Sequence, residues 1–328
     1  MSLPELQFLW FTAFVVLAIG YVLLDGFDLG VGILHLFSKK DEERRLMLNS
    51  IGPVWDGNEV WLVTAGGALF AGFPPIYATL LSSFYTPIMM LLCGIIFRAV
   101  AIEVRSKSPK IWWRWLWDIL FALASAVIAF ILGVLMGNLI SGIPLDEAGE
   151  YSGFFLDLVH PYAILVGVMA VALFMMHGSI YLMMKTEGEF HEKMRHFVNP
   201  SIIFFIILYA LTTMSTLIYH THMLESIRDN WIFFVIAVIN ILAIANIPRE
   251  ISLGRDGRAF LSSCGNIICL MALYAIGTYP VVIRDSSPPF LNSLTIYNAS
   301  SSMLTLKILL IIALIGVPLV LSYTIAVY

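Results

Sequence analysis

Long runs of apolar residues constrain the fold of this 328-residue chain more than any other feature. A run of about 20 apolar residues is long enough to cross the hydrocarbon core of a bilayer as a helix. Apolar residues make up 60% of the chain and charged residues only 12%, about half the charged share of an average soluble domain. We therefore predict an all-α polytopic membrane protein, a single transmembrane domain over residues 1–328, with nine helices at 7–36, 53–72, 76–103, 116–141, 159–184, 198–221, 230–247, 259–283 and 302–327.

The positive charges fall almost entirely on one side of these predicted helices. When loops are counted alternately, the other side holds only Arg228 and Arg284, and two more cations, Arg98 and Lys307, lie within helices. Cytoplasmic loops carry the excess of Lys and Arg, so we expect the N-terminus outside and the C-terminus in the cytoplasm. The run 53–72 is rich in polar residues and glycine, but leaving it out would place basic loops on both sides of the membrane. The charge distribution therefore supports a helix there. The cytoplasmic set is Lys39, Lys40, Arg44, Arg45, Arg105, Lys107, Lys110, Arg114, Lys185, Lys193, Arg195, Arg249, Arg255 and Arg258.

Acidic residues recur inside the apolar runs, where they are costly. Asp25 and Asp28 lie in the first run, and Asp56 and Glu59 in the second. Each would cost about 2.5–3.5 kcal/mol at the centre of a lipid-facing helix, so we expect these side chains to face protein, water or a cation. The spacing i, i+3 places each pair on one helix face. The spacing Gly26-x-x-x-Gly30 also predicts that another helix approaches the first one closely.

The predicted orientation brings these carboxylates to one depth, in the cytoplasmic third of the membrane. Arg98 lies near the inner end of the third run, and His177 lies in the inner half of the fifth. Four carboxylates against one arginine favour a hydrated cluster that takes up and releases protons. The structural alternative is that Arg98 pairs with one carboxylate while the others line an interface or, like Asp56, cap a helix start. For His177 we consider a buried hydrogen-bonding role and contact with a haem.

Two stretches resemble subunit II of the cytochrome bd-type quinol oxidases. One is Asp25-Gly26-Phe27-Asp28-Leu29-Gly30-Val31-Gly32, and the other runs from Arg44 through Pro53-Val54-Trp55-Asp56-Gly57-Asn58-Glu59-Val60-Trp61 to Ala71. Further blocks are similar to that family, namely Phe97-Arg98 with Arg105-Ser106-Lys107, and Gly133-x-x-x-Gly137-Asn138. The resemblance extends along the chain in order.

This resemblance implies a respiratory complex of the bacterial inner membrane that oxidises quinol and reduces O₂ to water. The haems of that family, two of b type and haem d, are expected in a larger partner, subunit I, and this chain is expected to hold no metal and no catalytic residue. Subunit II supplies stability, a share of proton uptake and, in some members, an O₂ path or a structural quinone. A small single-helix subunit and membrane lipid are further expected neighbours, and nucleic acid is not.

Residue by residue, the resemblance assigns roles to five of the positions above. Asp56 matches an aspartate of the proton pathway, and Trp61 matches a tryptophan at the mouth of an oxygen channel. Asp25, Asp28 and Arg98 match the buried charged set. A packing role for Trp61 is the alternative.

Two other functions fit the same carboxylates. Buried acids also couple protons to substrate in secondary transporters, although here they concentrate in the first three predicted helices, which favours a chain that docks on a partner. A purely structural scaffold subunit is the third hypothesis.

Overall fold

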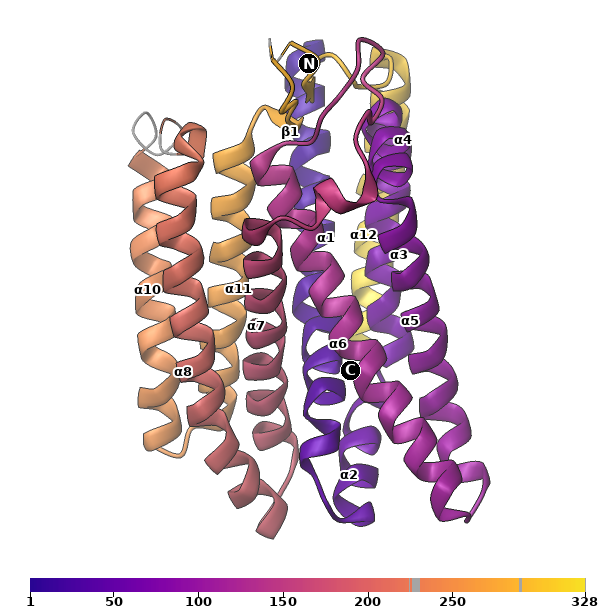
Figure 1. Cartoon of the computed structure of the whole chain (residues 1–328), viewed down its shortest axis with the longest axis vertical. Helices are drawn as coiled ribbons and strands as arrows, with labels where there is room; N and C mark the ends of the chain where they lie inside the picture. The colour runs from indigo at the N-terminus through magenta and orange to yellow at the C-terminus, as the bar shows by residue number, and fades with distance from the viewer. Residues whose placement is uncertain (224, 226–230, 289–290, 328) are drawn as a thin grey trace.

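The computed structural model describes residues 1–223, 225, 231–288 and 291–327, so Arg228 and the first residue of the predicted run 230–247 lie outside the described part. Long helices run nearly parallel in one bundle (Figure 1). The elements in chain order are α1 (Leu3–Leu34), η1 (His35–Phe37), α2 (Asp41–Ile51), α3 (Trp55–Gly72), α4 (Pro74–Ser83), α5 (Tyr85–Val104), η2 (Arg105–Lys107), α6 (Ile111–Ser141), η3 (Phe155–Leu158), α7 (Pro161–Lys185), α8 (Gly188–Tyr219), α10 (Trp231–Ser252), α11 (Asp256–Thr278), β1 (Val281–Ile283), β2 (Leu294–Thr295) and α12 (Met303–Val327).

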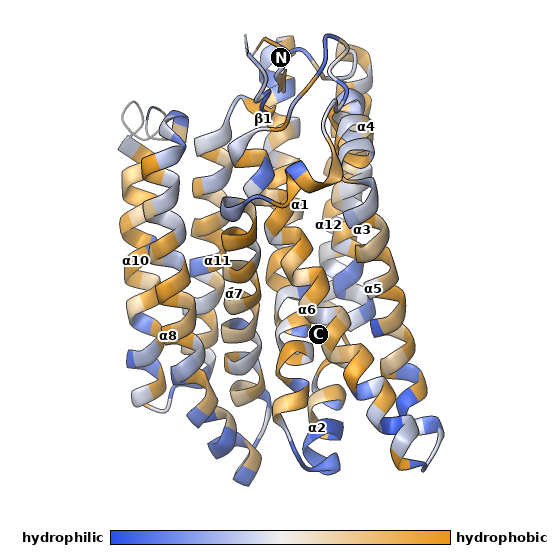
Figure 2. Cartoon of the chain, in the orientation of Figure 1, coloured by the Kyte–Doolittle hydropathy of each residue, from blue (hydrophilic) through white to orange (hydrophobic). Residues whose placement is uncertain are grey.

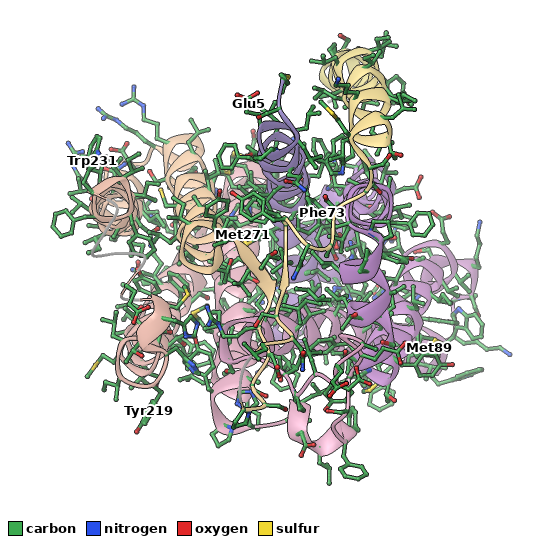
Figure 3. All side chains as sticks on the ribbon, turned by 90° about the horizontal axis from the view of Figure 1, so that it is seen from above. Glu5, Phe73, Met89, Tyr219, Trp231 and Met271 are labelled. Carbon is green, nitrogen blue, oxygen red and sulfur yellow. The ribbon has the colours of Figure 1, made fainter. Side chains whose placement is uncertain are left out.

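Helix α1 lies between two groups of helices. It packs against α3 and α6 on one side and against α7 and α11 on the other. Outside these helices, α5 packs on α6, α8 packs on α7, and α10 packs on α11. Helix α12 lies at the edge of the bundle (Figure 3) and exposes most of its side chains. Apolar residues dominate the middle of the bundle, and hydrophilic residues gather at the lower end in Figure 2. A membrane-spanning arrangement requires this pattern.

The predicted helices are present, with four differences. The predicted helix 259–283 is too long, because α11 ends at Thr278 and Val281–Ile283 form strand β1. Within the described residues, eight helices are long and apolar enough to cross a membrane. The run 53–72 forms α3, which has 18 residues and is not among the eight, because polar residues occupy its first turns. A ninth crossing and the orientation of the termini therefore stay predictions. The short helix α2 lies between the first two predicted helices, where the sequence predicts a loop.

The predicted helix 76–103 is wrong as a single element. The structure divides it into α4 and α5 at Phe84. Pro87 lies in the first turn of α5, and in a continuous helix its ring would clash with the carbonyl of Ser83. A helix start is the place where proline is tolerated, so the chain breaks just before it.

The predicted close approach at Gly26 and Gly30 is confirmed. A Cβ added at Gly30 would lie 2.8 Å from the Cα of Gly178 in α7, and one added at Gly26 would lie 3.1 Å from the ring of Phe174. Helices α1 and α7 therefore meet backbone to backbone, and this contact fixes the height of Asp25 and Asp28 relative to α7.

Replacing Gly178 by leucine should force α1 and α7 apart. Even the Cβ would lie 2.6 Å from the Cα of Gly30 and the N of Val31, which are backbone atoms that cannot rotate away. Overpacking of this kind costs about 1–3 kcal/mol or more, so we expect a lower thermal unfolding temperature of the purified protein. Gly66→Leu in α3 is the control, because nothing lies within 4 Å of a Cβ there. An equal loss in both variants would contradict the contact.

Candidate functional site

Three carboxylates surround Arg98 inside the bundle. Its guanidinium binds Asp25 with both nitrogens, Nη1 donating to Oδ2 at 2.9 Å and Nη2 donating to Oδ1. Nη2 also lies 3.8 Å from Asp28 Oδ2, and Nη1 lies 3.4 Å from Glu59 Oε1. Arg98, Asp25 and Asp28 are fully buried, whereas the side chain of Glu59 is 17% exposed. With Asn58, described next, these residues form what we call the arginine cluster.

Asn58 connects α3 to this cluster and was not singled out from the sequence. Its Nδ2 donates to Asp28 Oδ2 at 2.7 Å and to the carbonyl of Leu24 at 3.2 Å. The amide therefore satisfies one oxygen of Asp28, while Oδ1 of Asp28 is buried with no protein partner. The available signal was an amide side chain between two acidic residues, Asp56 and Glu59, near the start of a predicted membrane helix.

Asp56 does not join the arginine cluster. It lies exposed in the first turn of α3, three residues before Glu59, and no ion pair to it occurs among the described residues. The N-cap of α3 is Val54, and no side chain caps it, so the expected capping role of Asp56 is not observed at that position.

Trp61 lies one turn after Asn58 on α3 and also contacts α1. A Cβ added at Gly20 would lie 2.9 Å from Trp61 Cδ2, so the indole covers the space that this glycine leaves open. Trp61 is partly buried. This contact is a packing contact, and oxygen access at Trp61 stays a prediction.

His177 lies apart from the cluster, with both ring nitrogens engaged. Nδ1 lies 2.8 Å from Ser263 Oγ, and Nε2 lies 3.1 Å from the carbonyl of Leu23, to which it donates. The ring stacks on Phe260 at 4.9 Å between centroids. His177 thereby joins α1, α7 and α11, and the residue does not fit as a haem ligand, because neither nitrogen is free to bind iron.

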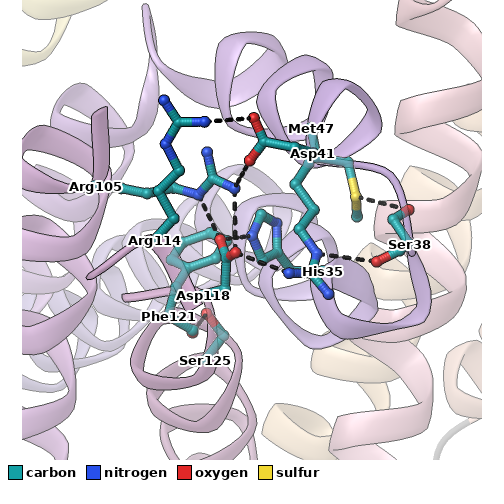
Figure 4. A network of polar contacts seen from close by, with 10 residues as sticks. His35, Ser38, Asp41, Met47, Arg105, Arg114, Asp118, Phe121 and Ser125 are labelled. Carbon is teal, nitrogen blue, oxygen red and sulfur yellow. Dashed lines mark hydrogen bonds and ion pairs between the residues drawn. The ribbon is translucent and has the colours of Figure 1, made fainter. Parts of the chain in front are cut away.

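A second network lies at the end of the bundle that contains α2 and is centred on Asp118 of α6 (Figure 4). Asp118 Oδ1 accepts from Arg105 Nε at 2.5 Å and lies 2.6 Å from His35 Nε2. Its Oδ2 accepts from Arg44 Nη1 at 2.9 Å and from Arg105 Nη2 at 3.1 Å. Asp118 and His35 are buried, so this network ties η1, α2, η2 and α6 together.

Asp41 continues the network toward solvent. It accepts from Arg105 Nη2 at 2.7 Å and from Arg114 Nη1 at 3.0 Å. The network therefore contains three arginines and two aspartates, and with His35 neutral its net charge is +1. We call these six residues the Asp118 network. Asp118 lies two residues after the start of the predicted helix 116–141, where an acidic residue is common, so the sequence did not single it out.

Neither network has the composition of a metal site. Among the described residues there is no group of three or more His, Cys, Asp or Glu side chains that could hold a metal ion. An apolar cavity of about 260 Å³ lies between α6, α7, α8, α10 and α11. Its few hydroxyl groups include those of Tyr162 and Thr216, which lie 2.7 Å apart.

Comparisons with known proteins give a consistent picture. The family model described as cytochrome bd terminal oxidase subunit II matches residues 6–328. Cytochrome bd-I ubiquinol oxidase subunit 2 of Escherichia coli K12 is 33% identical, over 97% of this chain and 92% of that protein. Cytochrome bd ubiquinol oxidase subunit 2 of Bacillus subtilis is 34% identical, over 98% of this chain and 94% of that protein. A solved bd oxidase structure from Geobacillus thermodenitrificans has the same fold, with a TM-score of 0.80 and 17% identity. The match covers 98% of this chain and 97% of that chain.

Proposed function

Because the chain belongs to the family of cytochrome bd terminal oxidase subunit II, we propose that it holds the haem-bearing subunit I in place and supplies protons from the cytoplasm to the reduction of O₂. It is a subunit of a quinol oxidase complex of the bacterial inner membrane, with subunit I as its partner and with haem and quinol used in the complex. This membership decides against the transporter hypothesis. We further propose that the haems are two of b type and haem d, that subunit I holds them, and that a small single-helix subunit accompanies the pair.

The observation that supports proton uptake is that three carboxyl groups share one guanidinium inside the bundle. Asp25, Asp28 and Glu59 all lie within 4 Å of Arg98. If all three were ionised, the cluster would carry a net charge of −2 in a medium of low dielectric constant, which is unfavourable. Such a cluster can change its proton content at low cost. We propose that Asp28, with its unpartnered Oδ1, is the innermost proton carrier of this chain.

The route from the cytoplasm to the cluster follows α3 in this proposal. Asp56 is exposed, Glu59 is partly exposed one turn further along the helix, and Asp28 is fully buried. The alternative route, between α1 and α6, would pass the Asp118 network. Its arginines and net charge of +1 oppose the passage of protons, as arginines do in water channels.

The exposed face of α3 supports a docking role toward subunit I. Asp56, Val60, Val63, Gly67 and Phe70 recur at intervals of four and three residues, and all are exposed. Asp56 lies in the first turn of α3, so the cost of a carboxylate at the centre of a lipid-facing helix, about 2.5–3.5 kcal/mol, is an upper bound for it. A protein partner that covers this face removes that cost, so we propose that subunit I packs on α3. The structural quinone expected in some family members would find an apolar environment in the cavity beside Tyr162.

Replacing Asp56 by asparagine should slow quinol-driven O₂ reduction about tenfold, since loss of a positioned proton-transfer group typically costs roughly 100-fold or more and Glu59 remains. We expect unchanged haem content and unchanged amounts of complex, because Asp56 has no ion pair within the described residues of this chain. The measurement is oxygen consumption per haem in purified complex, together with the rate of proton uptake.

The control is Glu42→Gln, which removes a carboxylate exposed at the same end of the bundle in α2. It should leave turnover unchanged. Normal turnover of Asp56→Asn at normal assembly would overturn the proton route and leave the scaffold hypothesis in its place.

A further inference from the structure

The turn between α5 and α6 is strongly basic and rich in tryptophan. Between residues 105 and 117 it carries four cations and four tryptophans, and it contains no acidic residue. We call residues 105–117 the basic turn. Its cations are Arg105, Lys107, Lys110 and Arg114, and its tryptophans are Trp112, Trp113, Trp115 and Trp117.

Hydrogen bonds hold the basic turn in a fixed shape. Trp113 Nε1 donates to the carbonyl of Val104 at 3.1 Å, and Arg114 Nε donates to the carbonyl of Ser108 at 3.4 Å. The ring of Trp113 contacts those of Trp112 and Trp117 edge to face, at 5.7 and 5.6 Å between centroids. The cations are therefore presented by a rigid surface, which lowers the entropy that a ligand must overcome on binding.

The positive charge of this region is not balanced within the described residues. Arg105 and Arg114 bind Asp41 and Asp118, as described above, but Lys107 and Lys110 are exposed and have no carboxylate partner there. With Arg44, the region holds five cations and two aspartates, and with the exposed Glu103, two residues before Arg105, its net charge is +2. In addition, Nη1 of the buried Arg105 has no protein hydrogen-bond partner.

The remaining features match an anion that carries an apolar chain. Helix α6 begins after Lys110 without a side-chain cap, so its first amides are free to donate to an anion. Directly beside them Ile111 is 86% exposed, and Trp112 and Trp115 are each 59% exposed. Tryptophan at such a position lies at the level of lipid headgroups. A soluble anion would gain nothing from this apolar surface.

We propose that the basic turn binds the phosphate headgroup of an anionic phospholipid, with its acyl chains along the exposed first turns of α6. Lys107, Lys110 and the N-terminus of α6 contact the phosphate, and Trp112 and Trp115 contact the upper part of the chains. Basic pockets between helices at the cytoplasmic surface are suited to such headgroups. The bound lipid neutralises the excess charge and supports the Asp118 network from outside.

The test is lipid retention by the purified complex with subunit I. The complex is equilibrated in micelles that contain phosphatidylglycerol and phosphatidylcholine, and native mass spectrometry counts the molecules of each that stay bound. Each lysine near a membrane surface contributes about 1 kcal/mol, so the double variant K107Q/K110Q should lose preference for phosphatidylglycerol by roughly 30-fold. The loss should shrink at high salt.

A matched control removes the same charge elsewhere on the basic end. Lys185 and Arg258 are exposed, with no carboxylate partner in the described part of the chain, so K185Q/R258Q should keep the wild-type preference. Equal losses in both double variants would mean general attraction to a positive surface and would overturn the site. Unchanged retention in K107Q/K110Q would overturn it as well. Displacement of the phosphatidylglycerol by an equal concentration of inorganic phosphate would assign the site to free phosphate instead.

Discussion

Replacing Arg98 by leucine is expected to reduce the assembled oxidase in the membrane to a small fraction of the wild-type amount. Arg98 is fully buried and binds both oxygens of Asp25, and Asp28 and Glu59 lie close by. Removing one partner of a buried ion pair costs about 3–5 kcal/mol, because the other charge stays buried and unpaired. That is a large share of the roughly 5–15 kcal/mol that stabilises a folded domain. The measurement is the amount of this chain and of haem in isolated membranes.

Two further variants distinguish the effect of an unpaired buried carboxylate from the effect of losing the Arg98 side chain itself. In the double variant Arg98→Leu/Asp25→Leu, the carboxylate that Arg98 binds most closely is removed as well, so assembly should partly recover. Arg98→Lys keeps the charge but cannot bind Asp25 with two nitrogens, and we expect an intermediate amount. Wild-type amounts of complex in the Arg98→Leu membranes would show that the pairing contributes little.

The contact of Arg98 with Asp25, Asp28 and Glu59 could be predicted from the sequence, because its signal is local and costly, whereas Asn58 was missed and Asp56 was wrongly included. Asp25 and Asp28 stand at i, i+3 in a run that is otherwise apolar, and only a partner makes such a pair tolerable in a membrane. The distribution of Lys and Arg then placed Arg98 at the same depth. The structure brings Arg98 to Asp25, Asp28 and Glu59. Their role in proton transfer stays a prediction, which the Asp56→Asn measurement tests.

Other features depend on contacts that no local pattern encodes. Asp118 is close to the predicted start of its helix, where an acid is ordinary, and its four donors come from η1, α2 and η2. Asp56 and Glu59 lie three residues apart on α3, yet only Glu59 reaches Arg98, because Asp56 lies one turn nearer the helix start and the rotation of α3 against α1 leaves it exposed. That rotation is fixed by Asn58 and by the fit of Trp61 over Gly20.

Replacing Asp118 by alanine should destabilise the end of the bundle that contains α2 by about 3–5 kcal/mol. The substitution leaves Arg105 and Arg44 without their buried acceptor, and it removes the partner of His35 Nε2. We expect a lower thermal unfolding temperature of the purified complex and faster proteolysis in the segment that contains α2. Oxygen consumption per intact haem should stay near the wild-type value, since the Asp118 network lies outside the proposed proton route.

Asp41→Asn is the matched control, because Asp41 binds the same Arg105 from the solvent side. The side chain of Asp41 is 42% exposed, and exposed ion pairs contribute only about 0–1 kcal/mol. A small effect for Asp41→Asn beside a large one for Asp118→Ala would show that burial, not the number of ion pairs, determines the contribution of this network. If Asp118→Ala instead lowered turnover at unchanged stability, the network would belong to the proton route. The positive charge of its arginines would then not be a barrier.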